Sequence, residues 1–360
     1  MRWPRVFALL CLFCCVTADA LVAGNRPISV SGPVDFAGLN EVITSHMDRV
    51  GATAASLVIV RDEALLTSRQ FGWANRAGTI PVREEHLFRL ASNTKPFTSA
   101  LVRSLIEEGT LKESDLVVDV LKLTPSGEDF NDPRWRLITV GHLLEHKGGW
   151  DRNETFDPLY RLTEVRREVA RRGAVRPDHV IEYMTRRPLQ FAPGDRFAYS
   201  NLGYVILGRV TEEVTGKPFI DALNERIARP IGITDLRLTA RTERRRPKLE
   251  VQYPKQTNRE IRVRVASGGL VCSPRSMTRF LQHYWIVGGK RPAIGRGYWY
   301  VHYGSLPGTT LSWMDQRKDG VCWALAMNAR NDETFNEDLK QVRDDVNKLI
   351  DDWRADGAMP

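Results

Sequence analysis

The chain contains the stretch Ser92-Asn93-Thr94-Lys95, which opens a predicted helix that ends at Gly109. Residues three apart lie one above the other on a helix face, so the Lys95 amine can reach the Ser92 hydroxyl. The free N–H groups of a helix N-terminus also suit an oxygen that becomes negative during acyl transfer. A hydroxyl beside a neutral amine is a candidate nucleophile. Taken alone, this short pattern is weak evidence for catalysis, because it more often marks a serine that simply caps a helix.

Apolar patterning on both sides of this helix predicts strands near the two ends of the chain and helices between them. Strands are expected at residues 54–60, 64–73, 297–303, 309–315 and 321–327. Helical spacing recurs at residues 139–145, 179–185, 204–215 and 219–228, and again from about residue 336 onward. This order predicts an α+β fold, an antiparallel sheet flanked by helices, with an inserted domain that is mostly helical.

The expected domain boundaries follow the same change of pattern. Residues 21–110 and 265–360 are predicted to form one discontinuous α/β sandwich domain, and residues 111–264 the helical insertion. The 360 residues are 42% hydrophobic and 27% charged, which excludes a disordered or fibrous chain. The formal net charge is +8, but acidic residues are interspersed among the arginine clusters, so no nucleic-acid partner is expected.

The first 20 residues resemble a secretory signal peptide. Arg2 and Arg5 precede an apolar run, and Ala18-Asp19-Ala20 provides small residues for cleavage. The run is shorter than the roughly 20 residues that span a bilayer, so cleavage near Ala20 is expected rather than a membrane anchor. No later stretch is long enough for a stable membrane span. The protein is therefore expected to be exported, to the periplasm or the extracellular medium.

Two cysteines, Cys272 and Cys322, lie outside this signal segment. A pair of cysteines cannot form a disulfide scaffold. It can form one bridge in an oxidising compartment or remain two buried thiols. The sequence leaves both possibilities open, as it does the oligomeric state.

Two further short motifs follow the first one along the chain. They are Tyr199-Ser200-Asn201 and His302-Tyr303-Gly304. With all three in this order, the sequence resembles the serine β-lactamase and penicillin-binding-protein superfamily. More narrowly, it resembles the class C β-lactamase-related group, which contains D-alanyl-D-alanine carboxypeptidases, D-aminopeptidases and β-lactamase-like esterases. The resemblance extends from about residue 36 to residue 353.

The resemblance implies catalytic roles for three side chains. Ser92 would be the acylated nucleophile, and Lys95 would be its base or a proton relay. Tyr199 would exchange protons with the nucleophile and the leaving group. Since tyrosine has an ordinary pKa near 10, acting as a base requires a nearby cation to hold that pKa down. The resemblance implies neither a metal nor a cofactor.

The resemblance also implies where the substrate is held. Asn201, His302 and Gly304 would contact it, and the backbone N–H groups of Ser92 and Ser305 would form the oxyanion hole. The substrate would be a small-molecule or peptide ester or amide.

Three positions differ from the residue that is most common in the superfamily. Tyr303 stands where β-lactamases and transpeptidases usually carry a small hydroxyl residue that helps to fix the substrate carboxylate, and His302 stands beside it in place of lysine. Gly148 stands where relatives commonly have serine. We therefore expect an esterase or a D-amino-acid peptidase. The alternative is a β-lactamase or a D-alanyl-D-alanine carboxypeptidase.

Two other classes of protein share features with this sequence. One is a penicillin-binding-like sensor that keeps the fold without catalysis, against which the intact Ser92, Lys95 and Tyr199 argue. The other is a zinc peptidase, because the segment from His142 to His146 has the spacing of an inverted zinc-protease motif. Zinc would need a third protein ligand, and the match is only five letters long. The plainer interpretation is two polar residues of a helix.

Overall fold

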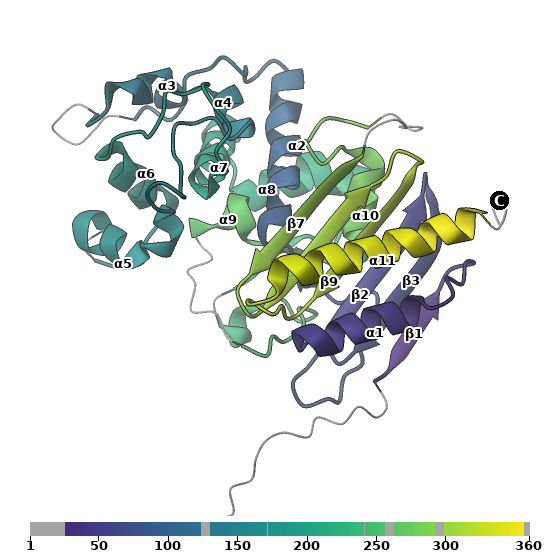
Figure 1. Cartoon of the computed structure of the whole chain (residues 1–360). Helices are drawn as coiled ribbons and strands as arrows, with labels where there is room; N and C mark the ends of the chain where they lie inside the picture. Colours follow the sequence, from purple (N-terminus) through teal and green to yellow (C-terminus); the bar gives the residue numbers. More distant parts are fainter. Residues whose placement is uncertain are drawn as a thin grey trace, which may run out of the picture.

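The computed structural model describes residues 26–123, 130–170, 172–240, 242–255, 263–291 and 299–355. The predicted signal segment lies outside these residues. The described chain has the expected α+β architecture, an antiparallel sheet covered by helices on both faces and a group of helices at one side (Figure 1). In the described part of the chain, every helix is too short or too polar to cross a bilayer.

The main sheet has six strands in the order β1-β3-β2-β9-β8-β7, and every pair in it is antiparallel. Both ends of the chain build it, because β2 pairs with β9. Strand β7 begins and ends three residues later than predicted, because pairing with β8 continues up to the turn at residues 307–309. The strands are β1 (Ile28–Ser31), β2 (Ala54–Arg61), β3 (Ala64–Gly72), β7 (Tyr300–Leu306), β8 (Thr310–Gln316) and β9 (Val321–Met327).

One face of the sheet is covered by α1 (Leu39–Val50) and α11 (Phe335–Ala355) (Figure 1). The apolar residues of α11 recur every three or four positions and bury Val346 and Ile350 against the sheet. The C-terminal helix predicted from about residue 336 is therefore confirmed.

The opposite face is covered by α2 (Thr94–Glu107), α8 (Phe219–Leu223) and α10 (Pro274–His283). Phe97 of α2 stacks on Phe280 of α10, with ring centroids 4.0 Å apart. Cys272 and Cys322 also lie buried on this side, and both are free thiols. The structure thus answers the question that the sequence left open.

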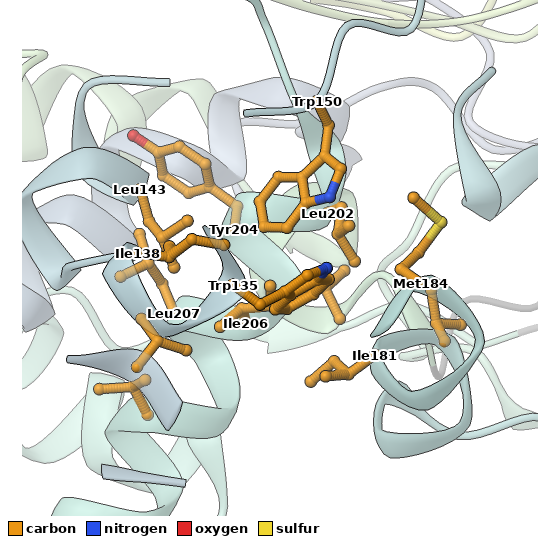
Figure 2. Close-up of a cluster of buried hydrophobic side chains, with 14 of the residues drawn as sticks. Trp135, Ile138, Leu143, Trp150, Ile181, Met184, Leu202, Tyr204, Ile206 and Leu207 are labelled. Atoms are coloured by element: carbon orange, nitrogen blue, oxygen red, sulfur yellow. The ribbon is translucent and has the colours of Figure 1, made fainter. Parts of the chain in front are cut away.

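The remaining helices gather at the side of the sheet and form what we call the helical lobe (Figure 1). Its core holds two tryptophans, Trp135 and Trp150, with aliphatic side chains from several helices (Figure 2). Val102 and Leu105 of α2 enter the same core, so α2 joins the lobe to the sheet. The lobe helices are α3 (Val117–Val120), α4 (Val140–Leu144), α5 (Leu162–Val165), α6 (Pro177–Thr185) and α7 (Asn201–Thr215).

A second, small sheet lies beside the start of α2. It has the order β4-β6-β5, and none of its three strands is among those predicted from the sequence. The short helix α9 (Val265–Gly268) leads into it. Its strands are β4 (Phe88–Arg89), β5 (Arg237–Leu238) and β6 (Leu270–Cys272). Helix α8 belongs to the predicted insertion, residues 111–264, but it packs in the core of the main sheet. The division of the chain into residues 21–110 plus 265–360 and residues 111–264 stays a prediction.

Candidate active site

Ser92 lies in a 3₁₀ turn, η1 (Ala91–Asn93), immediately before α2 rather than in the helix itself. The preceding residue, Ala91, is buried and has a φ of 46°, in the left-handed region that costs a non-glycine residue energy. Neighbouring backbone holds the turn in place: the N–H of Leu90 donates to the carbonyl of Leu270 at 2.9 Å. The strained turn therefore fixes where the Ser92 hydroxyl lies.

Lys95 is buried one helical turn from Ser92. Its Nζ donates to Asn201 Oδ1 at 2.7 Å, to the carbonyl oxygen of Ser267 at 2.8 Å and to Ser92 Oγ at 3.4 Å. Burial lowers the pKa of Lys95 to about 7. A large share of the molecules therefore carries a neutral amine at neutral pH, as a general base requires.

Asp157 is a part of the site that the sequence analysis missed. Its Oδ2 accepts a hydrogen bond from Asn201 Nδ2 at 2.5 Å, and the other end of the same amide accepts from Lys95. The charge of Asp157 raises the pKa of Lys95 and so opposes part of the effect of burial. Nothing in the sequence around Asp157 indicates this contact, because it joins residues 44 positions apart.

The link between Asp157 and Lys95 gives a prediction about pH. In Asp157→Asn the carboxylate no longer favours the charged amine, so the pKa of Lys95 should fall. The acidic limb of kcat/KM against pH is then expected to move to lower pH, with the plateau retained. A pH–rate profile with any substrate of the wild type measures the shift. A limb that stays in place, or that moves to higher pH, would contradict the assignment.

Tyr199 completes a cluster around the nucleophile. Its hydroxyl donates to Ser92 Oγ at 2.8 Å, and Lys95 Nζ lies 4.8 Å from the centroid of its ring. Burial raises the pKa of Tyr199 to about 12, so the phenol keeps its proton at neutral pH. The cation that was expected to lower this pKa does not offset burial, so Lys95 is the better proton acceptor of the two.

His146 supports Tyr199 from the side. The two rings stack with centroids 4.7 Å apart, and His146 Nδ1 accepts the N–H of Ser200 at 3.1 Å. Burial lowers the pKa of His146 to about 3, so the ring is neutral. The sequence analysis treated His146 as one of two polar helix residues, and this supporting role is therefore a finding of the structure.

The same contacts bear on the zinc interpretation. His142 Nδ1 accepts the N–H of Thr139 in a capping box, as His146 Nδ1 does that of Ser200. Among the residues that the structure describes, no three His, Cys, Asp or Glu side chains are placed to hold a metal ion. The donor set of the described chain does not fit zinc.

Strand β7 runs directly beside the nucleophile turn. His302 Nδ1 lies 2.8 Å from Asn93 Oδ1, and burial lowers the pKa of this imidazole to about 3. Gly304 approaches the turn so closely that a Cβ would lie 1.8 Å from the carbonyl oxygen of Leu90. The three site motifs thus meet at one place in the structure, at the edge of the sheet that faces α2 and the lobe.

Tyr303, the middle residue of the strand motif, packs on the other side of the sheet from His302. It pairs with Trp313 across β7 and β8, and the two rings stack with centroids 6.1 Å apart. Trp313 belongs to the core under α1 and α11, whereas His302 is paired with Met314, of the opposite core. Since successive side chains of a strand point to opposite faces, the Tyr303 ring lies on the face of the sheet away from His302 and Asn93.

The packing around position 148 explains why a glycine stands there. A Cβ at this position would lie 2.5 Å from the Trp150 ring and 3.0 Å from a methyl group of Leu143. A serine there would clash with the core of the lobe. Ser305, predicted for the oxyanion hole, has a side chain that accepts from Arg330 Nη1 at 2.8 Å.

The close approach of Gly304 predicts a sensitive position. In Gly304→Ala the methyl group must displace β7 from the turn, at about 1–3 kcal/mol, the usual cost of overpacking. Thermal unfolding should report the loss of stability, and activity should fall with it. Gly289→Ala is the matched control, because its Cβ would meet only Trp285, at 3.9 Å. Equal stability of the two variants would refute the steric argument.

An antiparallel sheet with a lateral helical lobe, and a serine, a lysine and a tyrosine gathered where they meet, defines a protein of the β-lactamase and transpeptidase fold. Residues 39–347 match the family model described as Beta-lactamase. The chain belongs to the β-lactamase family.

Its relatives include enzymes with different activities. It is 25% identical over 274 residues to the D-alanyl-D-alanine-carboxypeptidase/endopeptidase AmpH of Escherichia coli (strain K12), covering 75% of this chain and 67% of AmpH. It is 33% identical over 196 residues to esterase EstB of Burkholderia gladioli, covering 52% of this chain and 46% of EstB. The chain thus spans about half to two thirds of the length of the curated relatives it matches.

Solved structures agree on the fold. D-amino acid amidase from Ochrobactrum anthropi SV3 superimposes with a TM-score of 0.66 at 22% identity, over 88% of this chain and 98% of the amidase. The β-lactamase/D-alanine carboxypeptidase from Yersinia pestis gives a TM-score of 0.63 at 20% identity, over 87% and 97% of the two chains.

Proposed function

We propose that this protein is an exported serine hydrolase that cleaves an ester or amide bond through an acyl intermediate on Ser92. An esterase or D-amino-acid peptidase activity is favoured over that of a β-lactamase or D-alanyl-D-alanine carboxypeptidase. The observation that carries the proposal is the convergence of Tyr199 and Lys95 on one hydroxyl oxygen, at 2.8 Å and 3.4 Å.

In the proposed acylation step, neutral Lys95 accepts the proton of Ser92 as Oγ attacks the carbonyl carbon. The carbonyl oxygen becomes negative and is held by the backbone N–H groups of Ser92 and Ser305. Tyr199 then gives its proton to the departing oxygen or nitrogen and is reprotonated from Lys95. The bond to the leaving group breaks, and Ser92 carries the acyl group.

Deacylation repeats these transfers with water in place of the serine. Lys95 takes a proton from the water, directly or relayed through the Tyr199 hydroxyl. The oxygen of the water attacks the acyl carbon, and the proton returns to Ser92 Oγ as the ester bond breaks. Asn201 and Asp157 hold the amine of Lys95 in position throughout. The enzyme is regenerated, and the net reaction is hydrolysis.

Relatives with esterase, amidase and carboxypeptidase names support an acyl-transfer reaction but leave the substrate open. The test is intact-protein mass spectrometry after incubation with short-chain esters, D-amino-acid amides and peptides, and a penicillin. An acyl adduct from a turned-over ester or D-amino-acid substrate is expected. A long-lived penicillin adduct without ester or peptide turnover would favour the sensor. Failure of a fluorophosphonate probe to modify the protein would refute the proposal.

A further inference from the structure

The hydrogen bonds around His302 fix which of its nitrogens carries the proton. The hydroxyl of Ser312 donates to the carbonyl of Leu90 at 2.7 Å, so Ser312 Oγ accepts from Asn93 Nδ2 at 2.9 Å. That contact places Asn93 Oδ1, an acceptor, against His302 Nδ1 at 2.8 Å. Nδ1 must therefore be the donor, and the other nitrogen of the neutral ring is left as an acceptor.

This protonation has a consequence for the substrate. A ring nitrogen with a lone pair cannot donate to a carboxylate, and burial lowers the pKa of His302 to about 3, so the ring does not become cationic near neutral pH. The strand motif of this chain thus offers no positive charge to an anionic substrate group from His302. A carboxylate at this site needs a cation from elsewhere.

Arg152 is such a cation, and it comes from the helical lobe. Its guanidinium lies 4.7 Å from the centroid of the Tyr199 ring, and its side chain is exposed. The acidic residues nearest to it in the chain, Asp151 and Glu154, both pair with Arg196. Within the described ranges, no carboxylate forms an ion pair with Arg152, so its five N–H donors are available to a ligand.

The position of Arg152 also indicates which part of the substrate it would contact. In the proposed reaction Tyr199 delivers a proton to the leaving group, and Arg152 lies against the ring of Tyr199. The exposed ring of Phe197, edge-on to His146, provides an apolar surface in the same region. The leaving group is thus the part of the substrate next to the Arg152 guanidinium.

We propose that Arg152 is a specificity-determining residue that binds a carboxylate on the leaving group of the substrate, the role that His302 cannot fill. This inference rests on the proposed function and names the class of substrate, an ester or amide whose leaving group is an anion. A charge-assisted pair of this kind contributes about 1.5–3 kcal/mol, which corresponds to about a 10- to 100-fold preference.

The experiment uses two esters that differ only in this charge, 3-acetoxybenzoate and 3-acetoxybenzamide. Both are assayed near pH 8.5, well above the pKa of Lys95, so that the charge of Arg152 does not act through the amine. The wild type should hydrolyse the carboxylate ester with a kcat/KM about 10-fold or more above that of the amide ester. Most of the difference is expected in KM.

In Arg152→Ala this preference should vanish, and Arg152→Lys should restore part of it. Arg161→Ala is the matched control, because Arg161 is a cation of the same lobe that lies over Phe156 and not over Tyr199. It should keep the wild-type preference. A preference that survives in Arg152→Ala, or equal hydrolysis of both esters by the wild type, would overturn this inference and leave the proposed function standing. If the wild type hydrolyses neither this pair nor any other ester or amide, the proposed function fails as well.

Discussion

Ser92→Ala protein is expected to form no acyl adduct with any reagent that modifies the wild type, and its turnover should fall to the background rate. The loss of a serine nucleophile costs about 10⁶ in kcat in a well-studied serine protease. The reason here is that Tyr199 and Lys95 direct their polar atoms at this one hydroxyl. Intact mass and the hydrolysis rate of the best substrate measure the two effects.

The control for this variant is Ser99→Ala. Ser99 lies on α2, the helix that follows the nucleophile turn, and it is buried. It bonds the Tyr204 hydroxyl at 2.9 Å, so its loss removes a similar hydroxyl away from the nucleophile. It should cost about 1 kcal/mol of stability and leave the adduct intact. An adduct that persists in Ser92→Ala would show that another side chain is the nucleophile.

The contact between Ser92 and Lys95 could be predicted from the sequence because it is local. One helical turn brings the two side chains together whatever the rest of the fold does. Tyr199, on the other hand, was assigned by resemblance, since 107 residues separate it from the serine in the chain. The antiparallel sheet was predictable for a similar reason, because alternation within each strand is a local pattern.

The parts that the sequence analysis missed depend on long-range packing. Asp157 and Arg152 lie on a loop whose path is set by the core of the lobe, so no local pattern indicates that they meet Asn201 and Tyr199. The orientation of Tyr303 depends on strand register. A residue one position away from His302 points to the other face, and only the pairing with Trp313 shows which face that is.

Lys95→Ala is expected to lower the rate of acylation by about 10²–10⁴, the usual contribution of a general base. It should also remove the rise of kcat/KM with pH that the wild type is expected to show below pH 7. In the wild type the amine must be neutral to accept the proton of Ser92, and its pKa is about 7. kcat/KM should therefore rise with pH, about tenfold per unit below pH 7, and level off above it.

The direction of this pH dependence follows from the direction in which the pKa of Lys95 is shifted. Burial lowers the pKa of Lys95, so the neutral base appears at a lower pH than for an exposed lysine, and acid suppresses it. Lys147→Ala is the matched control, because Lys147 is a nearby lysine that pairs with Glu145. It should keep both the rate and the limb near pH 7. A Lys95→Ala enzyme that retains wild-type activity, or whose residual activity still rises through pH 7, would require a different base, and Tyr199 would be the first to test because its hydroxyl already contacts the nucleophile.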